Sequence, residues 1–101
     1  SILSIRYPNL EIIIIDNAST DNSVEEVKKR FPNVRIIRNS KNLGVDYPRN
    51  QGIIMSKGKY IWFLDSDVII TNKNCLKNML KLLKNKDIGC GGGRLLKIME
   101  F

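Results

Sequence analysis

Two aspartates, Asp65 and Asp67, come directly after the apolar run of residues 60–64. If that run is a buried strand, both carboxylates lie where the chain leaves a sheet. Their oxygens can then hold a hard cation such as magnesium or manganese, which keeps positions open for phosphate oxygens. Such a cation neutralises the charge that builds on a departing diphosphate. The alternative is that aspartate is simply a common turn residue, which an Asp-x-Asp pattern alone does not exclude.

A second polar segment, residues 16–21, follows the apolar run of residues 11–15 in the same way. The carboxylate of Asp16 and the amide of Asn17 can hydrogen-bond the polar edges of a nucleobase. We expect these two residues to bind a ligand and residues 21–23 to form a turn and a helix cap. A capping turn over the whole segment is the alternative, because Ser, Thr, Asn and Asp all favour such positions.

Arg49 and Asn50 come directly after Pro48, which is well placed in the first turn of a helix. The guanidinium of Arg49 can clamp a phosphate through paired hydrogen bonds, and a helix N-terminus favours an anion. We expect both residues to contribute to nucleotide binding. A solvated arginine at the start of a helix is the alternative.

Alternating strands and helices must position these groups. Short apolar or β-branched runs predict the strands, which are residues 11–15, 34–38 and 60–64. Apolar residues at helical spacing predict the helices, which are residues 1–6, 23–31, 48 to near 58, and 73–86. Ser23 and Glu26 have the spacing of a capping box at the start of one helix. Residues 88–98 are expected to be extended, with a bulge at their glycines.

Strands separated by helices of this length form right-handed crossover units. Residues 1–101 are therefore predicted to be one α/β domain with a mainly parallel sheet and flanking helices. In such sheets ligands bind beyond the carboxyl ends of the strands, and both acidic turns fall on that edge.

The amino-acid composition limits which catalytic chemistry and which partners are possible. The 101 residues include no histidine, which excludes histidine ligands, histidine acid–base chemistry and Ser-His or Cys-His pairs. The formal charge of +7 favours anionic partners, with a lysine-rich soluble surface as the alternative. Basic residues are not interleaved with aromatics, so we expect no nucleic acid partner. Two cysteines form no disulfide framework, which predicts the cytoplasm or the inner face of its membrane.

Taken together, these residues resemble the family 2 glycosyltransferases of the GT-A fold. The matching motifs stand in the family's order and intervals, and they are residues 7–21, 42–44, 49–53 and 65–67. The resemblance implies a Rossmann-like GT-A fold. It also implies transfer of a sugar from a nucleotide-diphosphate sugar to a saccharide or lipid-linked acceptor, with a divalent metal and usually with inversion.

The resemblance further implies roles for single residues. Asp16 would lie against the base, and Asp65 would lie near the ribose and the donor sugar. Asp67, with Asp65, would coordinate the metal, and Arg49 would face the phosphates. Where the family often has a second acid, this chain has Asn17.

Two departures limit the expected activity. The chain is expected to begin after the family's first strand and to stop before the acid that acts as general base. Glu100 is the last acid and does not match that motif. The catalytic base is therefore expected outside the chain, as is any membrane attachment, which would come through a longer parent protein. Two alternatives stay open, namely a non-catalytic nucleotide-binding module of the same fold and a basic surface that binds anionic polymers or membranes.

Overall fold

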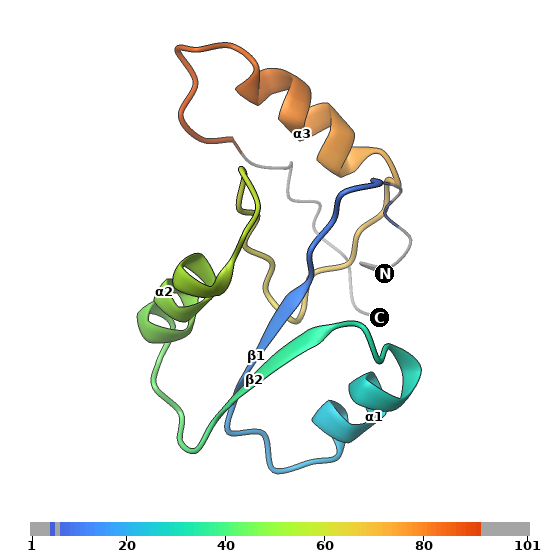
Figure 1. Cartoon of the computed structure of the whole chain (residues 1–101), viewed down its shortest axis with the longest axis vertical. Coiled ribbons are helices and arrows are strands. Elements are labelled where there is room, and N and C mark those ends of the chain that lie inside the picture. Colours follow the sequence, from blue (N-terminus) through green and yellow to red (C-terminus); the bar gives the residue numbers. More distant parts are fainter. Residues whose placement is uncertain (1–4, 6, 92–101) are drawn as a thin grey trace, which may run out of the picture. The chain divides into compact units, whose positions relative to one another are not determined.

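The structure is a computed structural model that describes residue 5 and residues 7–91. Residues 9–64 form one compact unit, and residues 65–91 belong to a second. The elements of the first unit are β1 (Ile13–Asn17), α1 (Ser23–Arg30), β2 (Arg35–Asn39) and α2 (Asp46–Met55), and the second contains α3 (Cys75–Leu83) (Figure 1). That the whole chain forms one domain stays a prediction.

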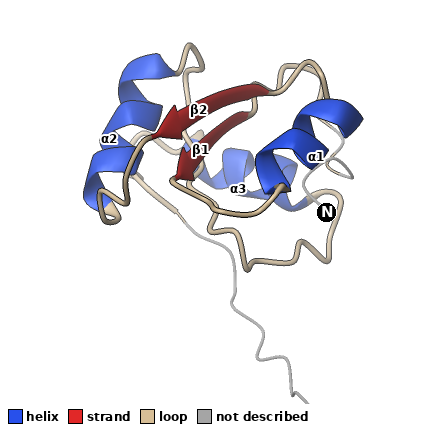
Figure 2. Ribbon diagram, turned by 90° about the horizontal axis from the view of Figure 1, so that it is seen from below, coloured by secondary structure: helices blue, strands red, loops and turns tan. Residues whose placement is uncertain are grey.

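β1 and β2 run parallel, in a register that begins at Ile13 opposite Arg35 and ends at Asn17 opposite Asn39. Parallel strands need a crossover connection, and here α1 lies in it. α1 and α2 lie on opposite sides of the strand pair (Figure 2). The predicted α/β architecture, with parallel strands and flanking helices, is confirmed for this unit.

Side chains along each strand alternate between the two faces of the pair. On the α1 side, Asp16 of β1 forms an ion pair with Arg38 of β2, Oδ2 to Nε at 3.6 Å. Arg38 also donates a hydrogen bond to Glu25 of α1 at 2.8 Å. On the other face, Gly52 of α2 lies so close to β1 that an added Cβ would be 3.5 Å from Ile15 Cδ1. Each helix thus covers one face of the pair.

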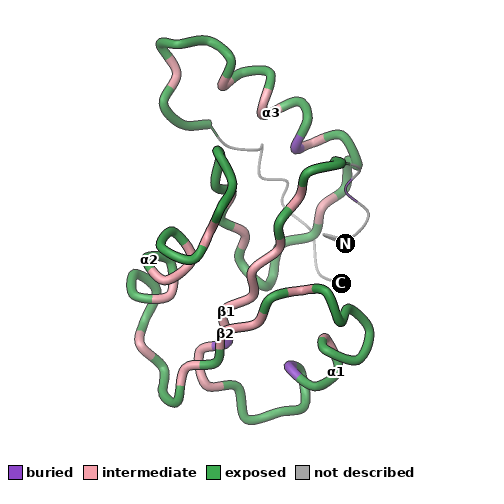
Figure 3. The backbone as a smooth tube through the Cα atoms, in the orientation of Figure 1, coloured by how far each residue is buried: buried purple, intermediate pink, exposed green. Residues whose placement is uncertain are grey.

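Few of residues 9–64 are buried (Figure 3). Val24 of α1 is the one buried hydrophobic residue of this unit, at 4% exposure. The isoleucines of β1 are half-buried, since two strands cover less of them than a wider sheet would. Asp16 is 7% exposed, so a carboxylate is shielded from solvent about as well as the apolar core.

α1 begins without the predicted capping box. Ser23 is its first residue, and the side chain of Glu26 pairs instead with Arg30 at 3.8 Å. The Asp21 carboxylate accepts hydrogen bonds from the Ser23 hydroxyl at 2.5 Å and the Ser23 backbone N–H at 3.1 Å. The capping-box prediction was wrong, because the Ser23 hydroxyl donates to Asp21 and does not cap a backbone N–H of the helix. These two bonds, the hydroxyl bond first, lower the pKa of Asp21.

α2 contains Pro48 in its first turn, as predicted, where a missing backbone N–H leaves no helical bond unmade. At its other end, Arg35 of β2 donates a hydrogen bond to the Met55 carbonyl at 3.0 Å. Glu11 lies 3.7 Å from Arg35 and accepts a hydrogen bond from the backbone N–H of Lys57 at 2.9 Å. These contacts fix the C-terminal end of α2 relative to the strands.

Two strand predictions need correction. The strand predicted at residues 11–15 is Ile13–Asn17, because pairing with β2 continues through Asp16 and Asn17. The apolar run 60–64 is not a strand, and within the described ranges it pairs with no neighbouring strand. A strand requires backbone hydrogen bonds to a neighbour, which an apolar sequence cannot supply by itself.

The second unit contains α3, which is shorter than the predicted helix at residues 73–86 and buries Leu76. The predicted helix at residues 1–6 lies outside the described residues, except for residue 5. The predicted extended segment, residues 88–98, is described only as far as residue 91 and has no regular structure there. Within the described part of the chain, no helix is long and apolar enough to cross a membrane.

Candidate functional site

Asp16 is the most buried charged residue at the carboxyl end of β1. Its two carboxylate oxygens accept hydrogen bonds from the backbone N–H of Ser19, at 3.2 and 3.3 Å. Arg38 Nε lies 3.6 Å from Oδ2. A carboxylate has about four lone-pair positions, so these partners leave Asp16 able to accept a further hydrogen bond from a ligand.

Ala18 turns the chain sharply after the strand. Its φ of 66° lies in the left-handed region, which costs a residue with a Cβ about 1 kcal/mol. This turn brings the backbone N–H of Ser19 onto the carboxylate of Asp16. Backbone strain is therefore concentrated beside the predicted base-binding residue, where it orients that carboxylate.

Asn17 connects the end of β1 to the loop of residues 42–44. Its Nδ2 donates to Asn42 Oδ1 at 2.8 Å and to the Gly44 carbonyl at 2.9 Å. Its Oδ1 accepts from the Leu43 backbone N–H at 3.0 Å. Both N–H bonds of the Asn17 side-chain amide are thus donated to the loop. Asn17 was predicted to bind a ligand, and in this arrangement neither N–H is available to an acceptor on a nucleobase.

Sequence reasoning gave no role to Arg38. This side chain joins the buried Asp16 to Glu25 on α1. A hydrogen bond from the backbone N–H of Glu25 itself, followed by the bond from Arg38, lowers the pKa of Glu25. The available signal was the register, because two parallel strands of equal length place Arg38 directly beside Asp16.

Asn39 and Gln51 form a reciprocal pair of amide hydrogen bonds, at 2.8 and 3.0 Å, between the end of β2 and α2. The pair fixes the middle of the helix that contains Arg49 and Asn50, both of which are exposed. The Arg49 guanidinium lies 5.9 Å from the ring centre of Phe63, within cation–π range. Phe63 lies in the run 60–64, which was predicted to be a buried strand, but it is 47% exposed, and this contact with Arg49 uses one of its ring faces.

Asp65 and Asp67 belong to the second unit. They lie on an exposed turn in which the Asp65 carbonyl accepts a hydrogen bond from the backbone N–H of Val68 at 3.2 Å. Over the part of the chain that is described, no group of three or more acidic, Cys or His side chains is gathered for a metal. A magnesium or manganese ion that also binds substrate phosphates needs only one or two carboxylates, so this donor set fits such an ion.

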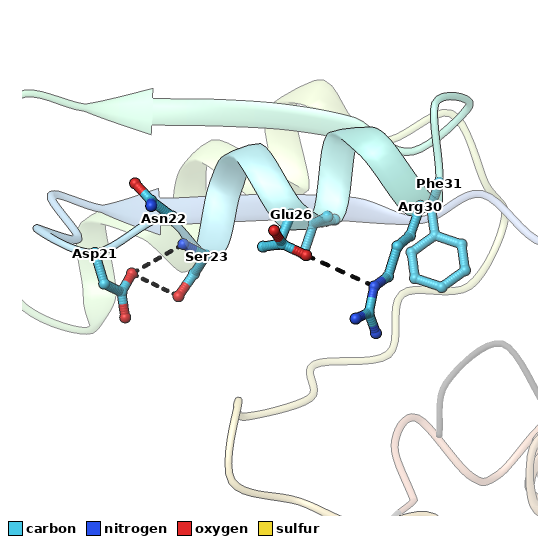
Figure 4. A pocket seen from close by; sticks show the side chains of 7 residues that line it. Asp21, Asn22, Ser23, Glu26, Arg30 and Phe31 are labelled. Atoms are coloured by element: carbon cyan, nitrogen blue, oxygen red, sulfur yellow. Dashed lines mark hydrogen bonds and ion pairs between the residues drawn. The ribbon is translucent and has the colours of Figure 1, made fainter.

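An open depression of about 520 Å³ runs along α1 (Figure 4). Asp21 and Ser23 lie at one end, and Arg30 and Phe31 lie at the other. None of the predicted site residues lines it. The polar groups at the end of β1 are therefore the better candidate for chemistry.

Known proteins resemble this chain in sequence. The family model described as glycosyl transferase family 2 matches residues 1–100. YibD of Escherichia coli K12, an uncharacterized glycosyltransferase, is 43% identical over 66% of this chain and 20% of its own length. The glycosyltransferase GlyG of Streptococcus pneumoniae is 35% identical over 85% of this chain and 29% of its own length.

A third relative carries a more specific name. The UDP-Glc:alpha-D-GlcNAc-diphosphoundecaprenol beta-1,3-glucosyltransferase WfaP of Escherichia coli is 41% identical over 66% of this chain and 27% of its own length. The chain thus spans between a fifth and a third of the length of these relatives. No solved structure matches the chain. The family implies a Rossmann-like GT-A fold, with which the parallel strands and flanking helices agree, and the chain belongs to glycosyl transferase family 2.

Proposed function

We propose that the protein transfers a sugar from a nucleotide-diphosphate sugar to a saccharide or lipid-linked acceptor, with a divalent cation and with inversion at the sugar. The observation that carries this proposal is the carboxyl end of β1. There, in a chain of glycosyl transferase family 2, the buried carboxylate of Asp16 keeps capacity for a ligand donor. The name of WfaP, with a UDP-Glc donor and a diphosphoundecaprenol acceptor, supports the lipid-linked class.

The residues divide this work by chemistry. Asp16 accepts a hydrogen bond from a donor on the nucleobase, through carboxylate lone pairs that Ser19 and Arg38 leave unused. Arg49 and Asn50 lie in the first half of α2, whose N-terminus favours the diphosphate. Asp65 also contributes near the ribose and the donor sugar.

The carboxylates of Asp65 and Asp67 would hold magnesium or manganese. The bound ion would supply charge neutralisation to the departing nucleoside diphosphate, a contribution of several kcal/mol at typical sites. Both side chains are exposed, so phosphate oxygens can complete the coordination from solvent. We propose the cytoplasm, or the inner face of its membrane, as the compartment where the donor is used.

Calorimetry with the full-length protein tests this proposal. Nucleoside diphosphates are titrated with and without manganese, and one of them should bind more tightly with the metal. Asp67→Ala should weaken metal-dependent binding by about 100-fold, whereas the matched change Asp87→Ala, at an exposed acid of the same unit, should not. Absence of any nucleoside diphosphate binding would refute the donor site. Binding without turnover would favour the non-catalytic module of the same fold.

A second candidate function rests on α3. Residues 72–86 contain no acid, and lysines recur along them at Lys73, Lys77, Lys81, Lys84 and Lys86, all exposed. An exposed row of cations without acids suits the anionic surface of a membrane, at about 1 kcal/mol per lysine. Peripheral membrane contact of this kind accords with a lipid-linked acceptor.

Vesicle sedimentation tests the α3 surface. Replacing Lys77 and Lys81 together by glutamine should weaken binding to phosphatidylglycerol vesicles by about 30-fold. The same double change at Lys28 and Lys29 of α1 is the control. Equal losses in both variants would mean that net charge alone attracts the protein, and phosphatidylcholine vesicles should bind neither variant nor the wild type.

A further inference from the structure

The loop of residues 42–44 is held by one side chain from a distant part of the sequence. Asn17 makes three hydrogen bonds to it, one to each of its residues, at 2.8 to 3.0 Å. The backbone groups of Leu43 and Gly44 also fix the orientation of the Asn17 amide. A backbone N–H must face its oxygen, and a backbone carbonyl must face its nitrogen.

The loop adds a bond of its own. Asn42 Oδ1 accepts from the Gly44 backbone N–H at 2.9 Å, in addition to the bond from Asn17. Gly44 has a φ of 77°, which a residue with a Cβ rarely adopts. The loop is thus a closed polar turn in which Asn42 is only an acceptor, whereas Asn17 is both donor and acceptor.

Adjacent residues of a strand point to opposite faces, and this separates the roles of Asp16 and Asn17. Asp16 faces the α1 side, where Arg38 contacts it. Asn17 shares its face with Asn39, whose amide bonds Gln51 of α2. Asn17 of β1 therefore holds the loop of residues 42–44, and Asn39 of β2 holds α2. Both contacts lie on the same face of the strand pair.

We propose that Asn17 is a positioning residue, which holds the 42–44 loop at the carboxyl end of β1 so that the nucleotide site is formed before the donor arrives. The ligand part of this inference rests on the proposed function. Its physical basis is preorganisation, because a loop already ordered need not lose conformational entropy on binding. An acid at position 17 keeps the size of the side chain but cannot donate to Asn42 Oδ1 or to the Gly44 carbonyl.

Two isosteric substitutions separate hydrogen bonding from charge. Asn17→Asp removes both donated bonds and places a carboxylate oxygen against two acceptors. Asn42→Asp adds the same charge to the same loop but keeps both accepted bonds. We expect Asn17→Asp to raise the Kd of the full-length protein for its nucleoside diphosphate by about 10- to 100-fold. Asn42→Asp should change that Kd by less than about threefold.

Amide hydrogen exchange of Leu43 and Gly44 reports the loop directly. Exchange at both should accelerate in Asn17→Ala, which removes the acceptor of the Leu43 N–H and both donated bonds. In Asn17→Asp a carboxylate oxygen can still accept from Leu43, so acceleration is expected mainly at Gly44. Exchange should stay near the wild-type rate in Asn42→Asp. Equal Kd changes in the two acidic variants, or unchanged exchange in both Asn17 variants, would overturn the inference. If the wild type binds no nucleoside diphosphate, the proposed function fails. Amide exchange of Leu43 and Gly44 then decides by itself whether Asn17 holds the loop.

Discussion

Replacing Gly52 by alanine is expected to stabilise the protein. Gly52 lies in α2. In a helix, alanine is favoured over glycine by about 0.5–1 kcal/mol, because an unfolded chain with alanine at that position has less conformational entropy to lose on folding. The new methyl group would lie 3.5 Å from Ile15 Cδ1, an ordinary van der Waals distance, so β1 need not move. The full gain should therefore appear as an increase in the free energy of unfolding.

Urea denaturation measures this change. With an m-value of about 2 kcal/mol/M, the midpoint should rise by about 0.25–0.5 M. The same substitution at Gly44 is the matched control. A Cβ there meets nothing within 4 Å, but φ is 77°, so Gly44→Ala should destabilise by about 1 kcal/mol through backbone strain alone. A loss of stability in Gly52→Ala would mean that α2 lies closer to β1 than described, and equal effects at both glycines would refute the reasoning.

Three further outcomes are expected. Val24→Ala, which removes buried apolar volume from α1, should lower the free energy of unfolding by about 1.5–2.5 kcal/mol in the same denaturation assay. Asp21 has a lowered pKa in the folded state, so its stabilising contribution is present above its ordinary value of 3.8 and is lost as the pH falls through the folded pKa. Wild-type protein should thus lose stability faster than Asp21→Asn as acid is added, and parallel pH curves would contradict this. Arg38→Met should move the pKa of Glu25 upward in a carboxyl NMR titration, although part of the lowering should persist because the bond from Glu25's own backbone N–H remains.

Helices and the first two strands could be predicted from sequence because their patterns are local. Apolar spacing placed α1 and α2 to within a few residues, and Pro48 marked a first turn. Strand ends were less well predicted, since pairing with β2 decides where β1 stops. The run 60–64 shows the limit of such prediction. A high β-propensity means that the residues would fit a sheet, but it does not indicate whether a partner strand lies beside them.

The candidate site was predicted in outline only. Asp16 could be singled out because an acid after an apolar run is visible in one sequence; the structure buries it, and its ligand role stays a prediction. The loop-holding bonds of Asn17 span 25 to 27 residues, and no local pattern reports contacts at that separation. Arg38 could have been found by aligning the two predicted strands, whereas the pairing of Asn39 with Gln51 depends on how α2 packs.

The reciprocal amide bonds between Asn39 and Gln51 have a consequence for work at different ionic strengths. Both groups are neutral, so salt leaves their attraction unchanged, whereas it screens the exposed ion pair of Arg38 with Glu25. α2 should accordingly stay packed against β2 in concentrated salt, while the electrostatic attraction of the protein for a charged diphosphate declines. If the phosphates bind at α2 as proposed, affinity lost at high salt should return in full on dilution, since the position of this helix does not depend on salt.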